Sequence, residues 1–364
     1  MIAPGMQQSR FRELDVLRGI AALFVVFFHL TMNEPQYKHI FKLGVTGVEL
    51  FFMISGFVIF MSLQKISSSA AFVINRISRL YPTYWTAVTF SLLLHLLFQY
   101  LTHNLALKSL FIKYIGNMTM FQFYMKIYNL ESPYWTLIIE MLFYILILIL
   151  FHFKLLKWVK HIFFVLSLTT VISIAFAFDN FWVKTIISQI PLFQFIPLFF
   201  AGILFYKIYS GEKRKNSWNY LLVIFCLVSQ QLLFQYAGGS RRFISWTEYN
   251  LILTFYFILF TIIINLDANF IINRFTLFFG KISFALYLTH KYVSLKYIIP
   301  LFHLKLGMNF WMVVFLIDIP IVIGIASFIT YKIEIPYSKK MKDALQKIFL
   351  FKQKTGSIIT GTTA

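Results

Sequence analysis

An arginine and a histidine, Arg18 and His29, lie eleven residues apart in an otherwise mostly apolar stretch, residues 14–32. At about 100° per residue, this spacing makes roughly three helical turns plus 20°, so both side chains share one helix face. They are then about 16 Å apart along the axis, roughly half the thickness of a hydrocarbon core. Because ionisable groups inside a bilayer are costly, the pair predicts a functional site. The alternative is an arginine that reaches one interface and a histidine hydrogen-bonded between helices.

Three further ionisable residues, Glu49, Glu140 and His290, lie within or at the ends of apolar segments. An imidazole can act as a general base near neutral pH, and a carboxylate can orient it. Both residue types also suit a proton-coupled transporter, which stays open as an alternative. Glu49 could instead be a surface carboxylate at a helix N-terminus, and His290 could mark the membrane interface.

Metal and disulfide chemistry have little support in the sequence. Two histidines and two glutamates could bind a metal, but they are scattered and no two have a short ligand spacing, so we predict no metal site. The single cysteine, Cys226, cannot form an intramolecular disulfide or a zinc cysteine cluster.

A second basic motif, Arg76 and Arg79, precedes the sequence LYPTYW. Arginines three residues apart share a helix face, and guanidinium groups fit phosphate oxygens well. The adjacent aromatic residues could stack on a base or line an acyl groove. Taken alone, the motif is explained more simply as membrane anchoring by positive charge and an aromatic belt.

The composition is that of an integral membrane protein. The chain has 364 residues, of which 59% are hydrophobic and 13% charged, whereas soluble domains are about half apolar and a quarter charged. Its apolar runs are too long and continuous for the alternating strands of a barrel, so we expect an all-α, polytopic membrane fold. The net charge of +20 lies mainly between apolar runs, where orientation and anionic lipid explain it without nucleic acid.

The apolar runs predict about ten transmembrane helices. They cover residues 14–32, 45–63, 81–101, 134–153, 162–178, 186–206, 218–236, 249–266, 275–293 and 310–330. An aromatic-rich segment, residues 107–128, could be interfacial, re-entrant or an eleventh span. With ten spans, 20 of the 33 lysines and arginines lie on the side of the N-terminus, so we expect both termini in the cytoplasm. Arg18 then lies toward the cytoplasm, and His29 lies in the outer half of the membrane together with Glu49, Glu140 and His290.

Six stretches together resemble the membrane acyltransferase-3 family, which includes bacterial O-acetyltransferases of surface glycans. They are LDVLRGIAALFVVFFH, GVELFFMISGF, RISRLYPTYW, YWTLIIEMLFY, GKISFALYLTH and YKIEIPYSKK. They follow the family's order and cover nearly the whole chain. Glu49 stands where the family often has an aspartate, and the extra C-terminal extracytoplasmic domain of some members is not expected here.

The resemblance implies transfer of an acyl group, expected to be acetyl, from cytoplasmic acyl-coenzyme A to a hydroxyl group of a cell-envelope carbohydrate or its precursor. His29 and Glu140 would be catalytic, and the three arginines Arg18, Arg76 and Arg79 would bind coenzyme A. The other candidate residues in or beside these motifs are Asp15, Glu49, Tyr134, Trp135 and His290.

Because no long polar segment could form a second domain, we expect one transmembrane acyltransferase domain, residues 1–350, with a short flexible cytoplasmic tail, residues 351–364. The expected location is the bacterial cytoplasmic membrane, crossed many times. The expected partners are acyl-coenzyme A as donor substrate, an outer-face carbohydrate acceptor and the lipid bilayer, with no permanently bound cofactor. A proton-coupled transporter or exporter remains the alternative.

Overall fold

The computed structural model describes residues 11–177, 180–211, 217–234, 240–266 and 268–360, and side chains up to residue 349. Within these ranges the chain is helical and has no strand, which confirms the all-α prediction. The α-helices are α1 (Arg12–Thr31), α2 (Gly47–Leu63), α3 (Ser69–Leu101), α4 (Leu107–Met118), α5 (Trp135–His152), α6 (Val159–Ala177), α7 (Phe181–Gln189), α8 (Ile196–Tyr209), α9 (Ser217–Leu233), α10 (Trp246–Asn265), α11 (Arg274–Val293), α12 (Phe310–Met312), α13 (Ile319–Ile329) and α14 (Ile335–Thr360). Short 3₁₀ segments are η1 (Lys42–Thr46), η2 (Ser132–Tyr134), η3 (Leu155–Trp158), η4 (Pro191–Phe195), η6 (Ser240–Arg242) and η7 (Asn269–Ile271), and π-helical segments are η8 (Ser294–Lys305), η9 (Val313–Asp318) and η10 (Thr330–Glu334).

Eight helical segments of the described chain are long and apolar enough to cross a bilayer. They are α1, η1–α2, α3, η2–α5, η3–α6, η4–α8, α10 and the run from Phe310 to Phe349. The described parts of two other predicted spans, residues 218–236 and 275–293, fold mainly as the helices α9 and α11, and residues 235 and 236 lie outside the described ranges. Helix α9 has only 17 residues, and α11 is long enough but too polar to be counted.

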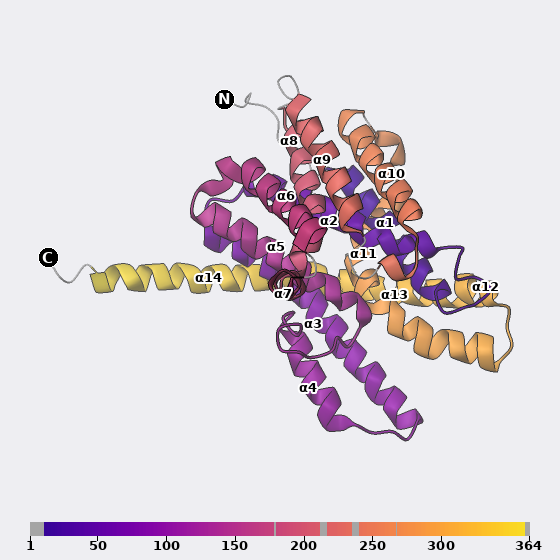
Figure 1. Cartoon of the computed structure of the whole chain (residues 1–364). Coiled ribbons are helices and arrows are strands. Elements are labelled where there is room, and N and C mark those ends of the chain that lie inside the picture. Colours follow the sequence, from indigo (N-terminus) through magenta and orange to yellow (C-terminus); the bar gives the residue numbers. More distant parts are fainter. Residues whose placement is uncertain (1–10, 178–179, 212–216, 235–239, 267, 361–364) are drawn as a thin grey trace.

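The segment 107–128 does not fold as an eleventh span. Helix α4 has 12 residues, which is about 18 Å at 1.5 Å per residue, and a hydrocarbon core is about 30 Å thick. It forms a hairpin with α3 that projects from the rest of the molecule (Figure 1). Trp85 and Tyr81 of α3 donate hydrogen bonds to the carbonyl oxygens of Met118 and Thr119, each at 3.0 Å. These two aromatic residues of LYPTYW therefore hold the end of α4 against α3.

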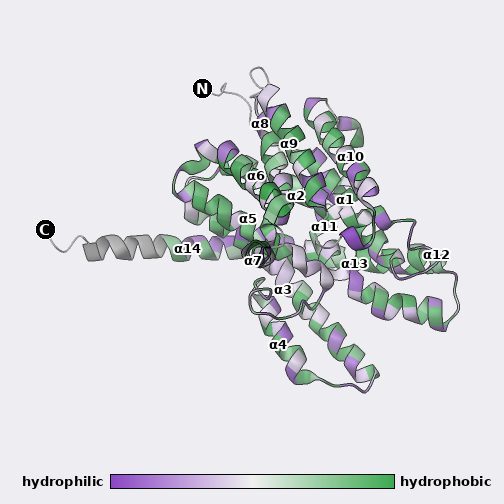
Figure 2. Cartoon of the chain, viewed as in Figure 1, coloured by the Kyte–Doolittle hydropathy of each residue, from purple (hydrophilic) through white to green (hydrophobic). Residues whose placement is uncertain are grey.

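Hydrophobic residues occur along the peripheral helices as well as the central ones (Figure 2). Phe176, Leu251 and Phe328 are 86%, 68% and 62% exposed. In water such surfaces promote association, whereas lipid tails solvate them well. The exposed apolar surface therefore fits a multi-pass membrane protein.

Helices α1 and α11 run in parallel and touch through glycines. A Cβ atom added to Gly280 would lie 2.1 Å from the carbonyl oxygen of Asp15, and one added to Gly19 would lie 2.7 Å from the Gly280 nitrogen. Both distances are shorter than real Cβ contacts, so only glycine permits this approach. His29 and His290 each lie ten residues, about 15 Å, beyond Gly19 and Gly280 respectively. The glycine crossing therefore sets the two histidines at one level.

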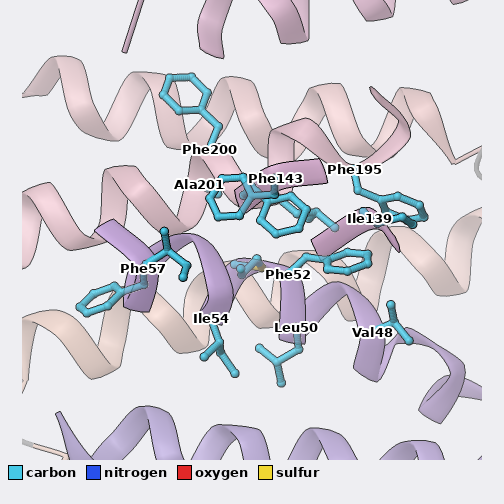
Figure 3. Packing of buried hydrophobic residues seen from close by; sticks show 14 of the residues in the cluster. Val48, Leu50, Phe52, Ile54, Phe57, Ile139, Phe143, Phe195, Phe200 and Ala201 are labelled. Atoms are coloured by element: carbon cyan, nitrogen blue, oxygen red, sulfur yellow. The ribbon is translucent and has the colours of Figure 1, made fainter. Parts of the chain in front are cut away.

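A second close crossing joins α2 and α8 at the centre of the largest apolar core. A Cβ atom on Gly202 would lie 2.1 Å from the carbonyl oxygen of Met53. Around it, Phe143 stacks on Phe199 with ring centres 4.2 Å apart, and Phe52 packs 5.0 Å from Phe195 (Figure 3). This core holds α5 against α2, which places the carboxylate of α5 described below.

The last predicted span, residues 310–330, is the first part of a continuous helical run from α12 to α14. Helix α14 extends far beyond the other helices (Figure 1). The predicted flexible tail, residues 351–364, overlaps the end of α14, and residues 361–364 lie outside the described ranges.

Candidate active site

A pocket of about 790 Å³ lies between α1, α2, α3, α5 and α11. Arg18 lines it from α1, Arg76 and Arg79 line it from α3, and Glu140 lines it from α5. The structure thus brings together four of the candidate residues from three separate motifs. We call this cavity the arginine pocket.

Arg76 is held among aromatic rings inside the pocket. Its guanidinium carbon lies 5.7 Å from the ring centre of Phe72 and 5.9 Å from that of Tyr144. Its Nε atom is buried and has no hydrogen-bond partner among the described residues. Because buried polar groups are nearly always paired, this nitrogen is a donor suited to an anionic or carbonyl ligand.

Glu140 accepts hydrogen bonds through Oε1 from two hydroxyl groups, those of Ser55 at 3.0 Å and of Tyr144. The sequence analysis missed both residues as site members. Tyr144 lies four residues after Glu140 on the same helix face, and this spacing could have indicated it. Ser55 lies in the motif GVELFFMISGF, where only the fold shows that it faces α5.

The arginine pocket continues into a larger cavity of about 1,410 Å³ at the end of the bundle where α1 and α11 begin. The two cavities share Arg18 and Arg79. The larger one is also lined by Lys65, Lys281 and Glu334. Three of its hydrophilic atoms are buried without a partner among the described residues: Thr330 Oγ1, Glu334 Oε2 and Ser338 Oγ. The closing motif YKIEIPYSKK therefore contributes to this entrance, a role that its sequence alone did not indicate.

His29 and His290 form a hydrogen-bonded pair at the other end of α1 and α11. His29 Nδ1 lies 2.9 Å from His290 Nε2, and His290 Nδ1 lies 2.9 Å from the carbonyl oxygen of Leu286. A carbonyl oxygen only accepts, so His290 Nδ1 carries a proton and, in the neutral ring, its Nε2 accepts. His29 Nδ1 then donates to His290. The lone pair of neutral His29 is therefore at Nε2, where a general base needs it.

Aromatic residues separate the arginine pocket from the histidine pair. Tyr287, three residues before His290, lines the pocket, and its ring centre lies 5.6 Å from that of Phe51. Its hydroxyl group lies 3.0 Å from that of Thr136 and donates to the carbonyl oxygen of Pro133 at 3.1 Å. The predicted set of four is thus divided: the histidines contact each other, whereas the hydrogen bonds of Glu140 are made inside the pocket.

Comparison with known proteins decides the family. A family model described as an acyltransferase domain matches residues 11–330. The chain belongs to the acyltransferase-3 family. A protein of the Acidianus two-tailed virus, provisionally named acetyltransferase ORF330, is 25% identical over 297 residues, which are 78% of this chain and 84% of that protein. No solved structure matches the chain.

The protein is therefore an enzyme that transfers acyl groups, and its apolar helices make it a multi-pass membrane acyltransferase. These findings favour acyl transfer over the transporter alternative.

The remaining candidate residues of this acyltransferase lie in different surroundings. Asp15 lines the larger cavity beside Arg18. Glu49 is only 2% exposed and accepts a hydrogen bond from Ser240 at 3.0 Å, so the interpretation as a surface carboxylate is wrong. Tyr134 is buried with its ring 5.2 Å from Tyr84, whereas Trp135 is 37% exposed.

Metal-binding side chains do not gather in the part of the acyltransferase that the structure describes. No group of three or more His, Cys, Asp or Glu residues is close enough there to hold an ion.

Proposed function

We propose that this acyltransferase is a membrane O-acetyltransferase that uses acetyl-coenzyme A and acetylates a hydroxyl group of a cell-envelope carbohydrate. The proposal rests on the two adjoining cavities, which share lining arginines and lead toward the histidine pair. In the predicted orientation this route begins at the cytoplasmic face of a cell membrane.

The phosphate groups of coenzyme A fit the cationic entrance. Lys65 and Lys281 line the larger cavity, and Arg18 and Arg79 line the passage into the arginine pocket. Guanidinium groups bind phosphate oxygens in a bidentate manner and tolerate burial better than ammonium groups. The slender pantetheine arm then lies in the arginine pocket, where Arg76 Nε gains the partner that it lacks.

The thioester must pass the two aromatic rings to react. Phe51 and Tyr287 line the inner end of the arginine pocket, and Tyr287 is one helical turn from His290. Rotation of the Phe51 ring would let the thioester pass from the pocket toward His29. Tyr287 is fixed by its two hydroxyl contacts, so Phe51 is the movable member of this pair.

His29 supplies the base for the transfer. Its Nε2 atom takes the proton of the acceptor hydroxyl while the oxygen attacks the thioester carbonyl carbon. The carbon–sulfur bond then breaks, and the proton passes from Nε2 to the departing thiolate, which leaves as coenzyme A. The products are one acetyl ester and one free thiol. The Nδ1–H of His29 stays bonded to His290 throughout, which keeps the Nε2 lone pair on the reacting side.

The test separates binding from chemistry. In purified full-length protein in lipid nanodiscs, His29→Ala should slow acetyl transfer by at least about a hundredfold and leave acetyl-coenzyme A binding, measured by calorimetry, within about twofold of wild type. The double variant Arg76→Ala/Arg79→Ala should lose that binding. Exposed Arg274 at the start of α11 offers a control, since Arg274→Ala removes a guanidinium group outside the pocket. Unchanged transfer by His29→Ala would refute the proposed mechanism.

A further inference from the structure

Two adjoining clefts lie at the end of the bundle where α1 and α11 finish. One, of about 930 Å³, lies between the segment 128–135 and the end of α11, and the other, of about 1,090 Å³, lies along α4. Tyr128 lines both clefts, so they adjoin at this residue and are treated together. We call this surface the lysine groove, because its charged residues are mostly lysines.

The charge of the groove is strongly positive. Its five lysines are Lys108, Lys113, Lys126, Lys291 and Lys296. Its lining contains one carboxyl group, that of Glu131, which is only 3% exposed. Burial raises the pKa of Glu131 to about 8, although Lys291 opposes the shift, so this carboxyl group is mostly protonated at pH 7. The groove therefore presents positive charge that no ionised carboxylate in its lining offsets.

The groove is built by internal hydrogen bonds. Asn117, which is fully buried at the end of α4, donates to the carbonyl oxygen of Tyr128 at 3.0 Å and accepts from the Leu130 nitrogen at 3.1 Å. Gln122 donates to the side chain of Asn129 at 2.7 Å. These bonds fix a loop that displays the Tyr128 ring, which is 82% exposed. Such an ordered loop can recognise a ligand without paying the entropy of folding on it.

The groove lies next to the histidine pair. Lys291 directly follows His290 and donates a hydrogen bond to Ser132, across the cleft that Trp135 also lines. A ligand bound along the groove therefore ends beside the proposed base. In the predicted orientation this end faces outward. The positive-inside rule concerns cytoplasmic loops, so it does not explain these lysines.

We infer that the lysine groove binds the acceptor, and that the acceptor is an anionic carbohydrate carrying carboxylate or phosphate groups. The inference rests on the proposed function, because it assigns the acceptor of that reaction. Lysine ammonium groups attract the anionic groups, and the exposed faces of Tyr128 and Trp135 pack on sugar rings. The groove supplies at least two kinds of contact: charge for the repeating anions, and flat apolar surface for the rings.

The first test measures binding to full-length protein in phosphatidylcholine nanodiscs, with hexameric oligogalacturonate as the acidic probe and maltohexaose as the neutral one. We expect oligogalacturonate to bind at least about tenfold more tightly, and this advantage to shrink as salt rises. The variant Lys108→Gln/Lys126→Gln/Lys296→Gln should lose the advantage, since all three side chains are exposed and can be changed without disturbing the core. Equal binding of both probes would overturn the inference.

Matched controls separate the groove from general charge and from lipid. The variant Lys339→Gln/Lys340→Gln/Lys347→Gln removes three exposed lysines from α14 and should bind oligogalacturonate like wild type. An equal loss of oligogalacturonate binding in both variants would overturn the inference. Binding of oligogalacturonate that is absent in phosphatidylcholine nanodiscs and requires phosphatidylglycerol would also overturn it. Acetyl-coenzyme A binding should be unchanged in the groove variant. Failure of that donor to bind wild type would count against the proposed function, whereas the oligosaccharide result stands independently.

Discussion

The two cationic regions of this acyltransferase differ in the residue that carries the charge. The arginine pocket is enclosed between five helices and contains three guanidinium groups together with Glu140. The lysine groove is built largely by a loop and the ends of helices, and three of its five lysines are exposed. Guanidinium is weakly hydrated and has a fixed fork, whereas ammonium is strongly hydrated and flexible. The difference indicates one small ligand of fixed shape at the first site and a polymer of variable register at the second.

The histidine pair lies between these regions and belongs to neither lining. The largest effect is therefore expected when the chemistry is removed and both binding regions stay intact. For His29→Ala we expect kcat to fall by about 10² to 10⁴-fold, the usual contribution of a general base. KM for acetyl-coenzyme A and for the acceptor should change little, as steady-state kinetics would show. Equal loss in kcat and in donor affinity would mean that His29 also holds the donor.

The glycine crossing of α1 and α11 connects the two regions, so it should be the next most sensitive point. Gly280→Ala places a Cβ atom 2.1 Å from the carbonyl oxygen of Asp15, which forces the helices apart. Overpacking of this kind costs about 1 to 3 kcal/mol. We expect a lower thermal unfolding temperature and at least about tenfold slower transfer, because the histidines lose their common level. Gly324→Ala is the control, since nothing lies within 4 Å of its added Cβ atom. A stable, fully active Gly280→Ala variant would contradict the claim that the close contact of α1 and α11 requires glycine at this position.

Replacing an arginine of the pocket with lysine, and a lysine of the groove with arginine, tests whether the two regions need different basic residues. Arg76→Lys keeps the charge in the pocket but loses the planar fork, so acetyl-coenzyme A should bind about tenfold more weakly. Lys296→Arg in the groove also keeps its charge and should leave acceptor binding within about twofold. Calorimetry with acetyl-coenzyme A and with oligogalacturonate measures both effects. Similar tolerance at the two positions would remove the distinction between a shaped site and an electrostatic surface.

Local periodicity was enough to predict one half of the site. The spacing of Arg18 and His29, and of Arg76 and Arg79, follows from the helical repeat, and the structure indeed shows these residues on α1 and α3. The contact between His29 and His290 joins residues 261 positions apart and depends on a glycine crossing that no local pattern reveals. Likewise, the lysines of the groove are spread over α4, the loop after it, the end of α11 and η8, so no single helical period groups them. The count of about ten spans stays a prediction: eight described segments have the length and apolarity of a span, and α11, which carries His290, is too polar to be counted with them.

The smallest expected effect comes from Glu131, the one carboxyl group in the lining of the lysine groove. Burial raises its pKa to about 8, and the titratable groups facing it are Lys291 and Tyr292 of α11 and Tyr134 of η2. As pH rises through about 8, Glu131 loses its proton and its carboxylate offsets part of the lysine charge. Oligogalacturonate should therefore bind a few-fold more weakly at pH 9 than at pH 7.

The variant Glu131→Gln removes this titrating carboxyl group and leaves the lysines of the groove in place. We expect its binding of oligogalacturonate to be nearly flat between pH 7 and pH 9 and similar to that of wild type at pH 7. No matching change should appear in acetyl-coenzyme A binding, since Glu131 lies in the groove and not in the arginine pocket. If the affinity for oligogalacturonate falls in parallel in wild type and Glu131→Gln, a group other than Glu131 titrates between pH 7 and pH 9. The groove is then already partly neutralised by Glu131 at pH 7. The arginine pocket, which contains Glu140 as well as its three cations, would then differ from the groove in enclosure alone.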